Sequence, residues 1–265
     1  MPPAPALILF DIDGTLIRRA GPHHRQALVD AVRRVTGLET STDHIPVHGM
    51  LDPDILTRML RDAGASAASI RRAMPEIVRR AQQIYVRRVP DLQRKTCPGV
   101  RALLRRLQHC GVLLGLVTGN LTRIGWKKLD RAGLKQYFRF GAFGQMAKDR
   151  AGLARLAIRR ARAQGWIVRH TPIALVGDAP SDIIAAQRNG IRSIAVHTGI
   201  STRDDLLAYA PDLLRIAALE TARAIFENQC EVVSLYREQQ ILSGSAVPAY
   251  SRSSSQAAQS SPVSS

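Results

Sequence analysis

Four short, mainly apolar runs are the clearest pattern along the chain. They occupy residues 7–10, 112–117, 173–176 and 193–196. A continuous apolar run of this length is typical of a strand that is covered on both faces of a parallel sheet. Segments whose apolar positions recur at helical spacing lie between the runs, at residues 100–110, 125–132, 153–163 and 182–189. This alternation predicts an α/β fold with a Rossmann-like, doubly wound parallel sheet.

The alternation is interrupted after the first run. From residue 17 to residue 95 the apolar positions follow a helical pattern, and no buried strand is evident. Strands and helices alternate again only after Cys97-Pro98-Gly99. We therefore expect an α-helical domain at residues 17–95, inserted into a core domain made of residues 1–16 and 96–218.

The last part of the chain differs in composition from the rest. Residues 219–242 keep a helical pattern and are expected to form a C-terminal helical extension. Residues 243–265 are dominated by Ser, Ala, Gln and Pro and carry almost no charge. Such a segment cannot bury enough apolar surface to fold, so it is predicted to be a disordered tail.

The formal net charge of +17 raises the question of nucleic-acid binding. Only five of the 38 basic residues are lysines, and many arginines occur in pairs spread over the predicted helices. Paired arginines of this kind indicate solvated helix faces, whereas a nucleic-acid site would favour one dense basic tract with interleaved aromatics. Aromatic residues make up 5% of the chain. We expect the charge to attract a small anionic substrate, and we disfavour nucleic acid as the main partner.

Three further features bear on location. The sequence has no run of 18 or more apolar residues, so no membrane span is expected. Its N-terminus lacks the basic and apolar regions of a secretory signal. The three cysteines are odd in number and widely spaced, which argues against a disulfide framework. These observations predict a reduced, cytoplasmic protein.

Two carboxylates follow the first apolar run directly, in Asp11-Ile12-Asp13-Gly14-Thr15. Ligands of an open α/β sheet bind beyond the C-terminal ends of its strands, where this segment begins. One carboxylate could attack phosphorus and become an aspartyl phosphate. The other could protonate the leaving oxygen and later deprotonate water. The simpler alternative is a turn in which both carboxylates only cap the next helix.

Polar residues follow two other runs. Thr118-Gly119-Asn120 offers a hydroxyl and unhindered backbone N–H groups, which suit phosphoryl oxygens. Asp178 and Asp182 follow the run at 173–176. Magnesium prefers hard oxygen ligands, so Asp178 could bind it directly and Asp182 directly or through water.

With these motifs in order, the chain closely resembles the haloacid dehalogenase superfamily over about residues 6 to 215. The resemblance implies that Asp11 is the nucleophile, Asp13 the general acid and base, and Thr118 a phosphate-binding residue. It also implies Mg²⁺ held by Asp11, the backbone carbonyl of Asp13 and Asp178, with Asp182 in support. The helical insertion resembles the cap of the phosphoglycolate phosphatase-like branch, which closes over the site and selects the substrate.

The basic residue of the family's third motif has two candidates in Lys148-Asp149-Arg150. The family places a lysine before a helix, often with a proline after it, and this chain has no proline there. Spacing to the following apolar positions favours Lys148. Arg150 competes because a guanidinium can grip phosphate through two hydrogen bonds.

These features together predict a Mg²⁺-dependent phosphatase that hydrolyses a small phosphorylated metabolite through an aspartyl phosphate. A phosphomutase of the β-phosphoglucomutase type is the nearest alternative, and a non-enzymatic basic binding protein on the same fold is a third. Members of the family that carry an aromatic residue or a threonine at the position of Asp13 catalyse other reactions, so this Asp favours phosphatases and phosphomutases.

His23-His24 has no partner at metal-ligand spacing and is expected to be a solvated hinge where the insertion begins. The segment at residues 49–52 could reach over the site or only pack within the insertion.

Overall fold

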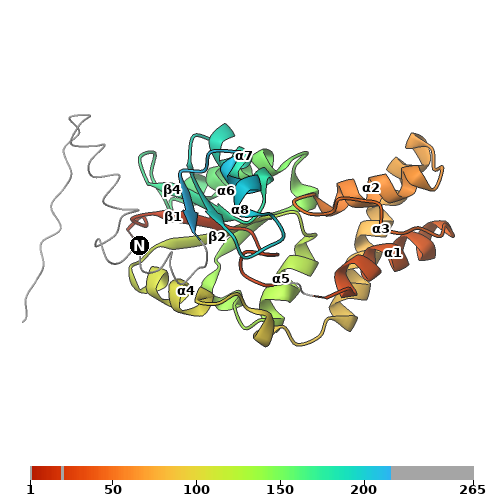
Figure 1. The fold of residues 1–265 in the computed structure, drawn as a ribbon, viewed down its shortest axis with the longest axis horizontal. Coiled ribbons are helices and arrows are strands. Elements are labelled where there is room, and N and C mark those ends of the chain that lie inside the picture. Colours follow the sequence, from red (N-terminus) through yellow and green to blue (C-terminus); the bar gives the residue numbers. More distant parts are fainter. Residues whose placement is uncertain (1, 19–20, 216–265) are drawn as a thin grey trace, which may run out of the picture.

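The computed structural model describes residues 2–18 and 21–215, which form a six-stranded sheet with helices on both faces (Figure 1). The strand order is β3-β2-β1-β4-β5-β6, so the first strand lies inside the sheet and later strands are added on either side. Every neighbouring pair of strands is parallel. The strands are β1 Leu7–Phe10, β2 Leu113–Thr118, β3 Phe140–Phe143, β4 Ile173–Gly177, β5 Arg192–Val196 and β6 Leu213–Arg215.

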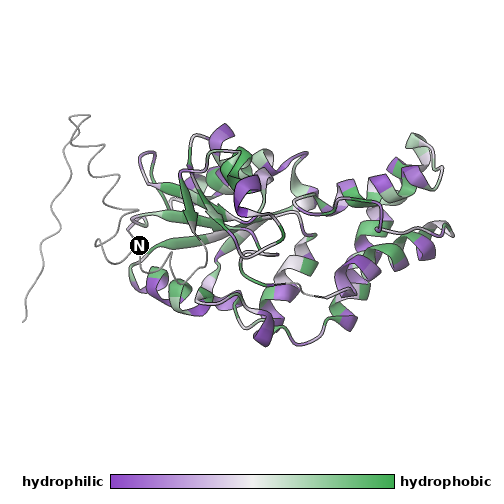
Figure 2. Cartoon of the chain, in the orientation of Figure 1, coloured by the Kyte–Doolittle hydropathy of each residue, from purple (hydrophilic) through white to green (hydrophobic). Residues whose placement is uncertain are grey.

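Different helices cover the two faces of the sheet. Neighbouring side chains of β1 enter opposite buried clusters, Phe10 with residues of α4 and α5, and Leu9 with residues of α6 and α7. Figure 2 shows the apolar strands between helices whose outer faces are polar. The helices of this layer structure are α4 Val100–His109, α5 Thr122–Arg131, α6 Arg150–Ala163, α7 Pro180–Arg188 and α8 Arg203–Leu207. Three short 3₁₀ helices, Gln93–Lys95, Lys135–Tyr137 and Gly144–Met146, lie in the connections.

The predicted α/β fold with a doubly wound parallel sheet is confirmed. The four predicted strands correspond to β1, β2, β4 and β5. Two strands were not predicted, β3 and β6. The first has only four residues and contains Gly141, and the second has only three, so neither carries a strong local signal for a strand. Both are stabilised by pairing with a stronger neighbour, β3 with β2 and β6 with β5.

Three helices lie between β1 and α4 and form the helical insertion: α1 His23–Thr36, α2 Asp52–Asp62 and α3 Ala67–Arg88. They share a buried cluster of their own, which includes Leu28, Leu56 and Ile77 and extends to Leu121 and Ile124 beside the sheet. The described residues between 21 and 90 contain no strand. Figure 1 shows the insertion to one side of the sheet. The division into domains at residues 16/17 and 95/96 stays a prediction.

The chain enters and leaves the helical insertion at one place. Ile17 and Thr96 form an isolated antiparallel bridge. The backbone N–H of Arg18 donates to the carbonyl of Lys95 at 2.7 Å, and that of Cys97 donates to the carbonyl of Leu16 at 2.9 Å. The two connections between the sheet and the insertion therefore run side by side.

The predicted C-terminal extension (219–242) and tail (243–265) lie outside the described residues, as do residues 216–218. Within the described part of the chain, no helix combines the length and the apolar character needed to cross a membrane.

Candidate active site

Three buried carboxylates meet beyond the C-terminal ends of β1 and β4. Asp11 directly follows β1, Asp178 directly follows β4, and Asp182 lies in the first turn of α7. Because β1 and β4 are parallel neighbours, their following residues reach the same edge of the sheet. One oxygen from each carboxylate lies within 4.8 Å of the others. We call these three residues the acidic triad.

Two glycines allow the backbone to approach Asp178 closely. A Cβ atom on Gly14 would lie 2.1 Å from Oδ2 of Asp178, and one on Gly199 would lie 1.6 Å from it. Gly14 also has a φ of 82°, which other residues rarely adopt. Any side chain at either position would displace the carboxylate.

Arg150 is the cation of the acidic triad. Its Nη1 lies 2.8 Å from Oδ1 of Asp182 and 3.0 Å from Oδ1 of Asp11, and the side chain is buried. The side chain of Asp149 caps α6 by accepting a hydrogen bond from the N–H of Gly152 at 2.7 Å. Arg150 is therefore the first residue of the helix and faces the sheet, whereas Lys148 precedes the cap and is exposed. The structure does not bring Lys148, which the sequence spacing favoured, to the triad.

The acidic triad is electrostatically suited to a cation. Burial, together with the charges of Asp11 and Asp182, raises the pKa of Asp178 to about 8. Burial also raises the pKa of Asp182, although Arg150 opposes this shift. Oδ2 of Asp178 is buried without a hydrogen-bond partner. Clustered carboxylate oxygens with an unused acceptor fit Mg²⁺, which prefers such ligands.

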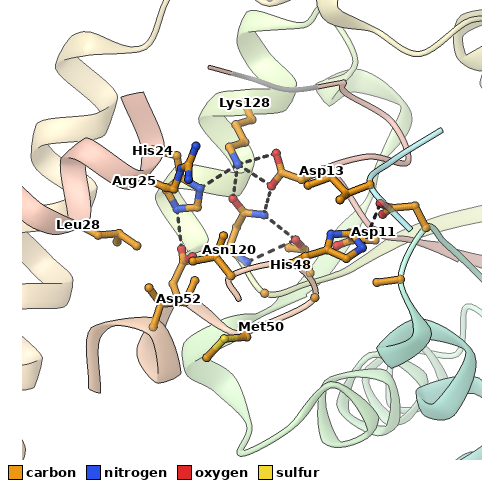
Figure 3. A pocket seen from close by; sticks show the side chains of 18 of the residues that line it. Asp11, Asp13, His24, Arg25, Leu28, His48, Met50, Asp52, Asn120 and Lys128 are labelled. Atoms are coloured by element: carbon orange, nitrogen blue, oxygen red, sulfur yellow. Dashed lines mark hydrogen bonds and ion pairs between the residues drawn. The ribbon is translucent and has the colours of Figure 1, made fainter. Parts of the chain in front are cut away.

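Asp13 lies in a different setting. Its side chain is 41% exposed and contacts the ammonium of Lys128, whose Nζ lies 2.8 Å from Oδ1 and 2.6 Å from Oδ2 (Figure 3). The surrounding protein desolvates the carboxyl and so raises its pKa. The charge of Lys128 and the hydrogen bonds from Lys128 and Asn120 outweigh this effect and hold the pKa of Asp13 below its ordinary value.

The loop after β2 links Asp13 to the predicted phosphate-binding residues. Nδ2 of Asn120 donates to Oδ2 of Asp13 and to Oγ1 of Thr118, both at 2.8 Å. The side-chain donors of Asn120 are therefore engaged within the protein. The backbone of Gly119 packs against the helical insertion, since a Cβ there would lie 2.2 Å from the carbonyl oxygen of Met50.

One cavity of about 650 Å³ joins most of these residues, within the range of roughly 300–1,000 Å³ that is typical of small-molecule sites. Its lining includes Asp11, Asp13, Thr118, Gly119, Asn120, Arg150 and Asp178. Side chains of the sheet edge form one wall, and the helical insertion forms the other. The insertion contributes His24, Arg25, Leu28, His48 and Met50. The segment at residues 49–52 thus reaches over the site, one of its two predicted alternatives.

The prediction that His23-His24 is a solvated hinge is wrong for His24. Its side chain is 16% exposed, and its Nε2 lies 2.9 Å from Oδ2 of Asp52. Its Nδ1 lies 3.1 Å from Nζ of Lys128. The first turn of α1 faces the sheet edge, so the ring is enclosed by core and insertion together.

Lys128 was missed by the sequence analysis. It stands beside Lys127, which forms an ordinary surface pair with Asp130, so the two lysines resembled a solvated face. One signal was available: Lys128 lies four residues after the buried Ile124, on the same helix face. A lysine on a buried helix face indicates a buried partner.

Comparison with known proteins finds one matching family model and several similar phosphatases. The family model described as haloacid dehalogenase-like hydrolase matches residues 8–196. A phosphoglycolate phosphatase of Synechococcus elongatus is 28% identical over 78% of this chain and 91% of its own length. A probable phosphatase, IndB, of Dickeya dadantii is 27% identical over 78% of this chain and 88% of its own.

Solved structures share the fold. β-Phosphoglucomutase from Clostridium difficile superposes with a TM-score of 0.63 at 19% identity, covering 89% of this chain and 99% of that one. CbbY from Rhodobacter sphaeroides, solved with phosphate, gives a TM-score of 0.62 at 23% identity, covering 81% and 95%.

Proposed function

The chain belongs to the haloacid dehalogenase-like hydrolases, and from that premise we propose that it is a Mg²⁺-dependent phosphatase that cleaves a small phosphomonoester through an aspartyl phosphate. The observation that carries this proposal is that Asp11 lies close to the carboxylates of Asp178 and Asp182, while Asp13, two residues later, faces the same cavity as Asp11. A nucleophile and an acid/base are thereby available side by side.

The proposed reaction has two displacements. In the first, an oxygen of Asp11 forms a bond to phosphorus, the bond from phosphorus to the leaving oxygen breaks, and that oxygen takes a proton from Asp13, which must enter this step protonated although Lys128 and Asn120 favour its ionised form in the free protein. In the second, water attacks the phosphorus, Asp13 takes a proton from the water, and the bond between phosphorus and Asp11 breaks. The products are the free alcohol and inorganic phosphate.

Other residues bind and orient in this proposal. The hydroxyl of Thr118 and the N–H of Gly119 would bind phosphoryl oxygens, and Arg150 would hold Asp11 and the phosphate together. Mg²⁺ would be held by Asp11, the backbone carbonyl of Asp13 and Asp178, with Asp182 in support, and would neutralise charge on the phosphate. The helical insertion would act as a cap that excludes water and selects the substrate.

The proposal is tested by phosphate release from an aryl phosphate with and without Mg²⁺. We expect Asp11→Asn to abolish the activity, because the amide cannot attack phosphorus. Asp62→Asn is the matched control, since Asp62 is exposed on α2 and pairs only with Arg58 among the ion pairs of the described residues. Wild-type activity in Asp11→Asn, in a preparation free of other phosphatases, would overturn the mechanism.

The physiological substrate belongs to the same test. Several relatives are named phosphoglycolate phosphatase, so phosphoglycolate is the first compound to assay, followed by sugar phosphates and nucleotides. The alternative predicted from the sequence, a phosphomutase, differs in what accepts the phosphoryl group. Incubating the phosphoenzyme with a sugar phosphate or with water alone distinguishes the two.

A further inference from the structure

Lys128 has an environment that its neighbours in α5 do not share. Its side chain is 1% exposed, and its ammonium has four acceptors within hydrogen-bonding distance. These are both oxygens of Asp13, Oδ1 of Asn120 at 2.7 Å and Nδ1 of His24 at 3.1 Å. A buried charge is costly unless it is paired and hydrogen-bonded, and this one is satisfied without bulk water.

The ion pair is asymmetric in its exposure. Both residues border the cavity, but the carboxylate of Asp13 keeps 41% of its side-chain surface, whereas the side chain of Lys128 is 1% exposed (Figure 3). A substrate in the cavity can therefore reach Asp13, while the protons of Lys128 are directed at protein atoms. The lysine is placed to act on Asp13 and not on the substrate.

On this geometry, and resting on the proposed phosphatase function, we propose that Lys128 is a positioning residue that holds the Asp13 carboxylate in place for proton transfer. A half-exposed aspartate would otherwise sample several rotamers. In the second displacement the ionised carboxylate must lie within hydrogen-bond reach of the attacking water to take its proton, so a fixed carboxylate is an advantage. Asn120 adds a second donor to the same carboxylate and ties it to Thr118.

The helical insertion takes part in this arrangement through His24. Because Nδ1 of His24 accepts from Lys128, the ring proton is on Nε2 and is donated to Oδ2 of Asp52. The same oxygen of Asp52 accepts the backbone N–H of Leu121 at 2.7 Å. The network therefore runs from Asp13 through the lysine to the insertion and returns to the loop after β2.

The test separates the two displacements by rapid mixing of the enzyme with 2,4-dinitrophenyl phosphate. Dinitrophenolate leaves readily without a proton, so the first displacement makes little demand on Asp13, whereas the second requires Asp13 to take a proton from water. We expect Lys128→Met to slow hydrolysis of the aspartyl phosphate by about 10²-fold, the lower end of the usual contribution of a general base, and to change the rate of dinitrophenolate release in the first turnover little.

Two comparisons separate positioning from a general effect on the fold. Lys127→Met, at the adjacent and partly exposed lysine, should leave the rates of both displacements unchanged. In an Asp13→Asn background, adding Lys128→Met should cause no further slowing of aspartyl-phosphate hydrolysis, because the lysine acts through the missing carboxylate. Lys128→Gln, which keeps a polar donor but no charge, replaces the methionine variant if that variant does not fold, and the same selective slowing of the second displacement is expected.

The outcomes distinguish the two proposals. An equal slowing of both displacements, no slowing, or a full additional slowing in the Asp13→Asn background would overturn the role of Lys128 while leaving the phosphatase proposal intact. A wild-type protein with no activity on any aryl phosphate would overturn both.

Discussion

Asp178 and Asp13 are two carboxylates of one cavity whose pKa values are moved in opposite directions. Asp178 is buried among other carboxylates, and its pKa rises to about 8. Asp13 is half-exposed beside an ammonium, and its pKa falls. The difference in pKa separates Asp178, a carboxylate that a bound cation would stabilise, from Asp13, which already lies beside the ammonium of Lys128. Opposed shifts of this kind are a feature of sites with divided chemical roles.

In the proposed magnesium site, the raised pKa of Asp178 would make the effect of Mg²⁺ on stability depend on pH. The folded protein holds a proton on Asp178 between its ordinary value of 3.8 and about 8, so the contribution of this group to stability falls as pH rises through that window. Mg²⁺ must displace that proton below about pH 8, whereas above it the site is ionised and ready.

We therefore expect Mg²⁺ to raise Tm more at about pH 9 than at about pH 6, as measured by calorimetry with and without the metal. Asp178→Asn should show little increase at either pH. Equal increases in the wild-type protein at both pH values would contradict the assignment of Asp178 as a magnesium ligand.

At the scale of elements, the residues at the ends of the strands were the part of the candidate site that could be predicted from the sequence. Asp11, Thr118 and Asp178 directly follow or end their strands, so a correct parallel sheet was enough to bring their positions together. Lys128 and His24 lie within helices, and their meeting depends on how α5 packs against α1, which no local spacing encodes. β3 was missed for a related reason, because its pairing with β2 outweighs its weak strand signal.

The start of α6 shows that the position of a residue relative to the helix cap decides whether its side chain reaches the acidic triad. Arg150, the first residue after the cap, is buried between two carboxylates, whereas Lys148, two residues earlier, is exposed. Sequence spacing favoured Lys148, which the structure places on the exposed side of the cap, because the spacing did not include the role of Asp149.

Removing each of these two cations in turn tests whether Arg150 or Lys148 contributes to the activity. Arg150→Met should lower phosphatase kcat by about 10²-fold or more, since it removes a charged donor from the reacting group's surroundings. Lys148→Met should have wild-type kinetics and stability. If steady-state kinetics instead show the larger loss in Lys148→Met, the assignment of Arg150 is incorrect.

At the scale of the whole molecule, the cavity that Asp11 and Asp178 line belongs to a strongly basic protein. The net charge is +17, many arginines are exposed on helices, and the outer faces of the helices are hydrophilic (Figure 2). Summed over the surface, such a charge raises the local concentration of anions near the site. This is the use of the charge that the sequence analysis favoured over nucleic-acid binding.

The long-range attraction predicts a dependence on ionic strength. We expect kcat/KM for a phosphomonoester to fall as KCl is raised toward about 0.1 M and above, where the Debye length shortens to about 10 Å. Sucrose at matched viscosity should not reproduce the fall. A kcat/KM that is constant across the salt series would indicate that only charges inside the cavity matter.

The paired crossing at Ile17 and Thr96 has a consequence for how proteins of this architecture diversify. An insertion whose two ends are hydrogen-bonded to each other could be removed, enlarged or exchanged without opening the parallel sheet. A replacement would have to supply a new apolar cover for Leu121 and Ile124, which are buried against the present insertion. If the insertion selects the substrate as proposed, a replacement at this single junction would change the substrate range and leave the residues at the strand ends in place.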